Sequence, residues 1–140
     1  MKDIEVFSYS GEGYKPLVDF ESWRVAILNY CDELLPQNIS SMQKHTLTDE
    51  CFILLSGSFT LFTGGSRNSI TDICATTLEP CKIYNVKKGV WHTHTLSLDA
   101  RVLIVENRNT DNTNSPVYAL DDQLKQQLLD CMENLTTVDT

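Results

Sequence analysis

The sequence predicts an all-β domain of the sandwich or barrel type that ends in one α-helix. Most of the chain falls into short segments rich in β-branched and aromatic residues, with turn residues between them. The length of 140 residues suits one domain with one core. Near the C-terminus the apolar residues change from the spacing of a strand to that of a helix.

The expected strands follow one another along most of the chain. Residues 4–9 alternate apolar and polar side chains, which is typical of a half-buried strand. Residues 51–55 and 59–62 flank the triplet Ser56-Gly57-Ser58, so we expect a hairpin with Gly57 in its turn. The other expected strands cover residues 23–30, 70–77, 82–86, 91–97 and 101–106. Strands this short and frequent are typical of a sandwich or a barrel.

Residues 51–55 are apolar on both faces of their expected strand, and residues 102–105 are apolar as well. A single small barrel has one interior, so the outward side chains need cover from another layer or another subunit. We therefore expect a homodimer.

The C-terminal segment of about 119–135 carries leucines at helical spacing. These are Leu120, Leu124, Leu128 and Leu135, with Cys131 or Met132 between the last two. Asp121 and Asp122 favour the positively polarised N-terminal end of such a helix. We expect the helix to pack on its own barrel, and a partner-binding helix is the alternative.

The composition argues against several classes of function, and we expect a cytoplasmic protein. A net charge of −8 repels nucleic acid and anionic lipid, and no apolar run approaches the ~20 residues that span a bilayer. The chain opens Met-Lys-Asp-Ile-Glu, where a signal peptide would be apolar. Five cysteines, an odd number without a Cys-x-x-Cys pair, argue against a disulfide framework or a thiolate zinc site.

The three histidines and one glutamate have the spacing of a metal site. Glu50 follows His45 with four residues between them, and Gly57 follows Glu50 with six between. Strand alternation places His92 and His94 on one face, and it places Gln43 on the same face as His45 if their strand is regular. One barrel interior would thus collect imidazoles and a carboxylate, a mixture that suits Zn²⁺, Fe²⁺, Ni²⁺ or Mn²⁺ without choosing among them.

These residues resemble the two sequence motifs of the cupins. His45, Glu50 and Gly57 match the second histidine, the glutamate and the last glycine of the first motif, and Lys-Lys-Gly-Val-Trp-His at 87–92 matches the core of the second. The chain resembles the small single-domain, RmlC-like cupins over roughly residues 23–107. Its Gly-Val-Trp-His segment, residues 89–92, is also similar to the corresponding segment of ureidoglycolate lyase-like cupins. The resemblance implies a cupin-type double-stranded β-helix, a jelly-roll barrel, in a single domain 1–140 with a barrel core of about 20–108.

The chain departs from the cupin pattern at four places. Gln43 stands where the first motif histidine is expected, Leu96 where the closing asparagine is expected, and Lys87 where proline is usual. The usual opening glycine is missing. The resemblance still implies a divalent metal held by His45, Glu50 and His92, with Gln43 as a weaker fourth ligand because an amide is a poorer donor than imidazole.

Three classes of function stay open. In the first, the metal polarises an oxygen of a small polar substrate such as a sugar or a hydroxy acid, in an isomerase or lyase reaction. Glu50 and His94 are then the candidate catalytic residues, with His94 or a second carboxylate moving the proton at a pKa near neutral. In the second, the barrel is a non-catalytic small-molecule-binding or sensory module. The third is a structural role in an assembly.

The same residues also allow a metal-free interpretation. They would then line a polar pocket, or the histidines would fill structural roles. A buried, unpaired Glu50 among apolar neighbours would cost several kcal/mol, which a metal or a histidine partner removes. Arg24 and Arg101 lie in apolar strands, where each forms a structural salt bridge or holds a carboxylate substrate.

Overall fold

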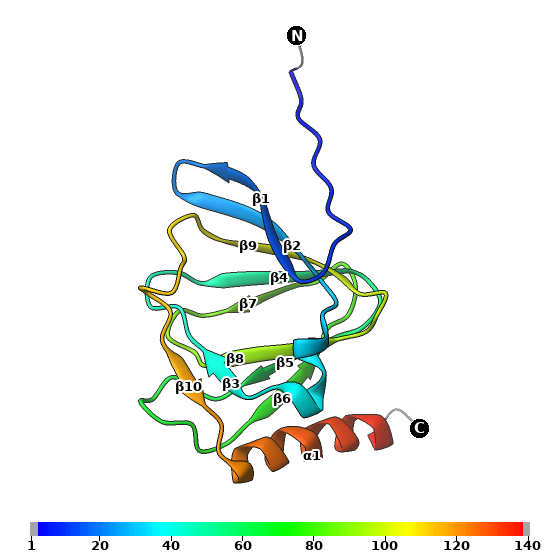
Figure 1. Cartoon of the computed structure of the whole chain (residues 1–140), viewed down its shortest axis with the longest axis vertical. Coiled ribbons are helices and arrows are strands. Elements are labelled where there is room, and N and C mark those ends of the chain that lie inside the picture. The colour runs from blue at the N-terminus through cyan, green and yellow to red at the C-terminus, as the bar shows by residue number, and fades with distance from the viewer. Residues whose placement is uncertain (1–2, 139–140) are drawn as a thin grey trace.

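The computed structural model describes residues 3–138, which form two five-stranded antiparallel sheets and one C-terminal helix (Figure 1). We call the two sheets sheet I and sheet II. Sheet I has the strand order β1 (Tyr14–Phe20), β2 (Trp23–Asn29), β9 (Arg101–Asn107), β4 (Glu50–Ser56) and β7 (Ile83–Val86). Sheet II has the order β10 (Val117–Ala119), β3 (Ser41–Gln43), β8 (His92–Leu96), β5 (Phe59–Thr63) and β6 (Cys74–Thr77). Two 3₁₀ turns, η1 (Asp32–Leu34) and η2 (Pro36–Asn38), link β2 to β3.

The chain passes repeatedly from one sheet to the other, which makes one of our predictions wrong. Ser56-Gly57-Ser58 does not form a hairpin, because β4 pairs with β7 and β9 in sheet I while β5 pairs with β6 and β8 in sheet II. Gly57 is nevertheless required there. It has a φ of +74°, and a Cβ at this position would lie 2.6 Å from the Cα of Ala100. Adjacent apolar runs therefore predicted the strands correctly but not their pairing.

Alternating side chains from both sheets fill the interior. Along β4, Glu50, Phe52 and Leu54 are buried while the residues between them are only partly covered. Along β9, Val102, Ile104 and Glu106 are buried in the same way. Each strand thus points an acidic residue inward at one end and apolar residues at the other, so the interior is polar on one side.

The helix α1 (Asp122–Val138) covers the outer face of sheet II (Figure 1). Leu124 and Leu128 pack in one buried cluster with Phe62 and Trp91. The backbone N–H of Leu124 donates to Asp121 Oδ1 at 2.8 Å, which caps the first turn. The prediction that the helix packs on its own barrel is confirmed.

Some strands differ from those expected. Residues 4–9 form no strand but an extended segment that projects from the barrel (Figure 1), because no second surface of the described chain covers their apolar side chains. The expected strand 70–77 begins only at Cys74. No strand was expected at β1 or β10, since β1 contains a proline and β10 has only three residues. The strand expected to hold both Gln43 and His45 ends at Gln43, and His45 lies in the loop that follows β3. Among residues 3–138, no helix is long and apolar enough to cross a bilayer.

Candidate metal centre

A cavity of about 420 Å³ is lined by side chains from both sheets. It lies at the polar side of the interior, where β4 and β9 turn their acidic residues inward. The structure brings together there all five site residues expected from the sequence, and adds a second carboxyl group. The six side chains are Gln43, His45, Glu50, His92, His94 and Glu106.

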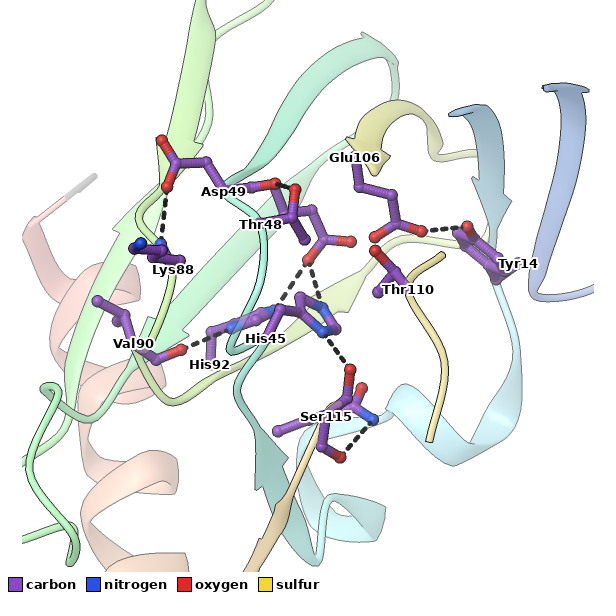
Figure 2. Close-up of polar contacts among 12 residues, drawn as sticks. Tyr14, His45, Thr48, Asp49, Lys88, Val90, His92, Glu106, Thr110 and Ser115 are labelled. Atoms are coloured by element: carbon purple, nitrogen blue, oxygen red, sulfur yellow. Dashed lines mark hydrogen bonds and ion pairs between the residues drawn. The ribbon is translucent and has the colours of Figure 1, made fainter. Parts of the chain in front are cut away.

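His45, Glu50 and His92 form the centre of this cavity wall. His45 Nε2 lies 3.2 Å and His92 Nε2 lies 2.9 Å from the same carboxylate oxygen, Glu50 Oε1 (Figure 2). All three side chains are buried, and one ligand atom from each lies within 4.8 Å of the others. Two histidines and a carboxylate gathered this closely form a donor set typical of transition-metal sites.

The hydrogen bonds of His92 show which of its nitrogens is free to bind an ion. Its Nδ1 lies 2.9 Å from the backbone oxygen of Val90. A carbonyl oxygen only accepts hydrogen bonds, so Nδ1 carries the proton and the Nε2 of the neutral ring presents a lone pair. That lone pair faces the oxygen of Glu50. Two acceptors this close need a proton or a cation between them.

His45 is oriented in the same way. Its Nδ1 lies 2.7 Å from Ser115 Oγ, which itself donates to Asn114 Oδ1 at 3.1 Å. The Asn114 oxygen is identified by the N–H of Asp111, which also donates to it at 3.1 Å. Ser115 therefore accepts from His45 Nδ1–H, and the Nε2 lone pair of the neutral ring again points at Glu50. Partners of this kind fix the orientation and tautomer of metal-binding histidines.

The spacing of the three atoms fits a coordination sphere. Ligands about 2.1 Å from an ion lie about 3.0 Å apart when they are at right angles, and about 3.4 Å apart in a tetrahedron. The observed 2.9 and 3.2 Å, both measured to Glu50 Oε1, are comparable to these two spacings. The residues present therefore fit a divalent ion with open positions for other ligands.

Gln43 lies beside this cluster. In the pairing of β3 with β8 it is directly opposite His92, and it lines the cavity. Its amide nitrogen donates to the backbone oxygen of Ser115 at 3.3 Å. The amide oxygen is then the atom with which Gln43 would bind a metal, and that binding stays a prediction.

The protonation of the cluster follows from its contacts. Burial acts to raise the pKa of Glu50, but its hydrogen bonds with His45 and His92 outweigh burial and hold that pKa well below its usual range. Burial acts to lower the pKa of His92, but the Glu50 carboxylate outweighs it and the pKa of His92 is raised. Without a metal, protonation of His92 thus places a proton between its Nε2 and the Glu50 oxygen, so that the two acceptors no longer repel each other.

His94 shares the cavity-facing side of β8 with His92, as the alternation predicts. Its ring stacks on Phe59 with centroids 5.1 Å apart and lies 5.9 Å from the ring of Phe52. Burial lowers the pKa of His94 to about 4, below the near-neutral value that we expected. His94 is therefore neutral at pH 7, and its buried Nδ1 has no hydrogen-bond partner among residues 3–138.

A second polar wall of the cavity was not expected from the sequence. Tyr14 Oη donates a short hydrogen bond to Glu106 Oε1, while Glu106 Oε2 is buried with no partner in the described chain (Figure 2). Burial, and then the negative charge of Glu50, raise the pKa of Glu106 to about 8. Its inward direction was available from the sequence, since Glu106 follows Ile104 by two positions in an expected strand.

The two arginines considered in the sequence analysis have different positions. Arg24 lines the cavity and forms an ion pair with Asp19 through its Nε at 3.1 Å. Arg24 Nη1 also lies 3.9 Å from Glu106 Oε1. The salt-bridge interpretation of Arg24 is thus confirmed, and Arg101 is exposed on the other face of sheet I.

Comparison with known proteins identifies the fold. No family model and no curated protein matches the chain. A cupin-2 domain protein from Shewanella frigidimarina is similar in structure, with a TM-score of 0.51 at 17% identity over 71% of this chain and 85% of that one. The chain has the cupin fold. The expected jelly-roll architecture and the likeness to small RmlC-like cupins are confirmed.

Two sugar-nucleotide enzymes share this cupin fold. One is a double mutant of the QdtA 3,4-ketoisomerase from Thermoanaerobacterium thermosaccharolyticum in complex with TDP, with a TM-score of 0.55 at 15% identity over 75% of this chain and 83% of that one. The other is the WlaRB TDP-quinovose 3,4-ketoisomerase from Campylobacter jejuni, with a TM-score of 0.51 at 17% identity over 76% and 74%. Identities this low establish the fold alone.

Within the cupin fold, the two motif segments meet directly. The backbone N–H of Gly89 donates to the backbone oxygen of His45 at 2.8 Å, which joins the second motif to the first. Gly89 has a φ of +81°, a conformation that favours glycine. Leu96, at the position of the usual asparagine, is buried in the apolar core. That departure enlarges the core and leaves the His–Glu–His cluster intact.

Proposed function

We propose that this chain binds one divalent metal ion in its barrel and acts on a small polar metabolite such as a sugar or a hydroxy acid. The ligands are His45, Glu50 and His92, with Gln43 as a weaker fourth, and the reaction is of the isomerase or lyase type. The observation that carries the proposal is the convergence of two imidazole lone pairs on one carboxylate oxygen at the spacing of neighbouring metal ligands.

The protein groups around the cluster have separate roles in this proposal. A bound metal supplies a Lewis acid that polarises a carbonyl or hydroxyl oxygen. Tyr14 and Glu106, on the opposite wall, present polar side chains to the hydroxyl groups of the substrate. His94 lines the cavity as a neutral imidazole. Leu28 and Ile104 line the same cavity and exclude water from the reacting atoms.

The cavity suits a metabolite of modest size. Its volume of about 420 Å³ is within the usual range for small-molecule sites. Both walls carry polar side chains, which favours a ligand with several hydroxyl groups over an apolar one. Two of the similar structures are sugar-nucleotide ketoisomerases, which supports a carbohydrate-like substrate.

A second candidate function is a non-catalytic, small-molecule-binding or sensory cupin. It is favoured by Gln43, because an amide in place of the cupin histidine weakens the metal site. It is also compatible with His94, since a pKa of about 4 makes this imidazole a weak base at pH 7.

The two functions differ in whether the metal-loaded chain turns its ligand over. The purified protein is loaded with Zn²⁺, Fe²⁺, Ni²⁺ or Mn²⁺ after elemental analysis and is offered a panel of sugars and hydroxy acids in D₂O. We expect deuterium exchange next to the carbonyl carbon, or product formation, that disappears with chelator. Thermal stabilisation by a panel member without turnover would favour the sensory cupin. Neither effect with any metal would contradict both functions.

Replacing Glu106 with Ala separates substrate contact from metal binding. We expect Glu106→Ala to keep its metal and to lose about 10-fold or more in substrate affinity or turnover, as expected when one buried hydrogen bond is lost. Asp111→Ala is the matched control, because Asp111 lines the same cavity but is exposed. Loss of metal in Glu106→Ala would instead make Glu106 a ligand and contradict its assigned role.

A further inference from the structure

A second cavity lies where the two sheets end without pairing. β7 is the last strand of sheet I and β6 is the last strand of sheet II. A cavity of about 820 Å³ is lined there by residues of β5, β6 and β7 and by the loop 64–73. It is larger than the cavity at the metal centre, and the candidate metal ligands line only that other cavity. The proposed function therefore makes no use of this second cavity.

Strand pairing places hydroxyl groups on the inner faces of both sheets at this cavity. Leu61 belongs to the buried core, and its cross-strand partner Thr76 projects to the same side of sheet II. Tyr84 is opposite the buried Phe52, so it faces inward at the edge of sheet I. The Tyr84 hydroxyl accepts from the backbone N–H of Glu79 at 3.0 Å, and its own proton therefore remains available to a ligand.

Two cations line the second cavity, namely Arg67 in the loop 64–73 and Lys87 directly after β7. The ion pairs that lysine and arginine form within residues 3–138 use other side chains, which are Arg24, Lys82 and Arg108. One carboxylate, Asp72, lines the same cavity, so the cations outnumber it. This excess of positive charge occurs in a chain with a net charge of −8, and it favours an anionic ligand.

The loop 64–73 is held in place through its carbonyl oxygens. The backbone N–H of Trp91 donates to the backbone oxygen of Gly65 at 2.9 Å, and the Trp91 indole N–H donates to that of Arg67 at 2.8 Å. The backbone N–H groups of Ser66 and Arg67, in contrast, have no acceptor within the described part of the chain. A fixed loop with free N–H groups beside two cations is a typical environment for a bound oxyanion.

We propose that the second cavity binds a small phosphate-bearing ligand. The planar guanidinium of Arg67 can donate to two phosphate oxygens at once, and Lys87 supplies a second positive charge. The volume is within the usual range for a small molecule and exceeds what a single phosphate group fills, which favours a phosphorylated metabolite. Asp72 and Tyr84 then hydrogen-bond the hydroxyl groups of that metabolite.

The second cavity lies directly beside the metal centre. Thr63 lines the second cavity and is opposite His92 in the pairing of β5 with β8. Val86 lines it as well and is opposite Glu50 in the pairing of β7 with β4. Neighbouring strands are about 5 Å apart, so the phosphate ligand would lie next to the metal ligands without sharing a residue with them. The proposal does not depend on metal binding or on turnover, so the two can fail separately.

Protection of a thiol measures binding at this cavity. Cys74 and Cys81 are both free and exposed, but only Cys74 lines the second cavity. The metal-free protein is treated with N-ethylmaleimide at constant ionic strength, alone or with inorganic phosphate, glucose 6-phosphate, glucose or citrate. Mass spectrometry gives the rate of modification of each cysteine. We expect saturating glucose 6-phosphate to slow the modification of Cys74 by at least about 10-fold and to leave Cys81 unchanged, because the reagent reaches Cys74 only in the unbound fraction.

Three variants identify the residues that hold the phosphate. Arg67→Ala and Lys87→Ala should each raise the concentration for half-protection of Cys74 by about 10-fold, as the loss of one charge-assisted hydrogen bond does. Lys88→Ala is the matched control, because it removes the same charge at the next position but does not line the cavity. It should leave protection unchanged, and an unchanged rate at Cys81 in each variant verifies the fold.

The comparison of ligands decides the rest. Protection by glucose 6-phosphate at a lower concentration than inorganic phosphate supports a phosphate ester, and equal protection supports inorganic phosphate itself. Three results would overturn the proposal. The first is no protection of Cys74 by either phosphate compound at about 50 mM, far above the dissociation constant of a weak millimolar site. The second is equal or better protection by glucose or citrate. The third is protection that survives both Arg67→Ala and Lys87→Ala.

Discussion

Competition with a chelator should show that His45→Ala and His92→Ala each lose measurable binding of a divalent metal. Each substitution removes one of three ligand atoms that lie within 4.8 Å of one another, and two remaining ligands rarely hold a divalent ion. His94→Ala is the matched control, because His94 lies on the same strand and lines the same cavity but stacks on Phe59. It should keep the affinity of the parent chain.

Two further substitutions define the other ligands. Gln43→His should tighten metal binding, because neutral imidazole is a better donor to these metals than an amide. Glu50→Gln keeps the shape of the side chain and removes its charge, so loss of metal in this variant shows ligation rather than packing. If His45→Ala and His92→Ala bind metal as well as the parent chain does, these residues line a metal-free pocket and the metal-site proposal is wrong.

The sequence predicted the centre of this site because two simple regularities determine it. Alternation along a strand decides which residues face the interior, and it placed His92 and His94 together on the cavity side. The spacing from His45 to Glu50 and Gly57 resembles a known motif, and the structure joins that segment to the second motif through the Gly89–His45 backbone bond.

The outer parts of the site could not be predicted in this way. Ser115 orients His45 from a loop, and no periodicity places a loop residue seventy positions away. Tyr14 reaches Glu106 from β1, a strand that the sequence analysis missed because Pro16 lies within it. Both contacts arise from long-range packing, which depends on how strands pair and not on local residue patterns.

The missing strand at residues 4–9 has a different explanation. The alternation of this segment correctly indicates a need for one covered face, and the exposed Ile4 and Val6 show that its own barrel does not supply the cover. The alternation therefore predicted an extended segment with one apolar face, but it did not predict which surface covers that face. The same holds for residues 51–55, where Phe52 faces the interior and Ile53 lies on the outer face of sheet I.

The pH dependence of stability should have opposite signs in the metal-free and the metal-loaded protein. In the metal-free fold the pKa of His92 is raised above its ordinary value of 6.5 by the Glu50 carboxylate. The stability that this contributes is fully present below pH 6.5, and it is lost as the pH rises through the raised pKa. Metal binding needs deprotonated imidazoles, so its contribution to stability grows over the same range.

Glu106 and His94 also change how stability depends on pH, and their contributions can be separated from that of His92. Glu106, with a pKa raised from 4.5 to about 8, also loses its contribution to stability as the pH rises toward 8, so it has the same sign as His92. His94 has a lowered pKa of about 4, and its contribution is lost only as the pH falls below 6.5. A window from about pH 6.5 to pH 8 therefore excludes His94, and Glu106→Gln removes the contribution of Glu106. It also lies below the range in which the thiols of Cys31, Cys51 and Cys131 titrate, since burial raises the pKa of each.

Thermal unfolding in this window measures the effect. With chelator, we expect the free energy of unfolding to fall by on the order of 1 kcal/mol per pH unit, because one to two protons are released. With saturating metal, the unfolding temperature should rise with pH over the same window. Glu50→Gln should flatten the chelator curve, since it removes the carboxylate that raises the pKa of His92. Parallel curves with and without metal would mean that no ion engages His92, and the metal-free pocket would then be the correct interpretation.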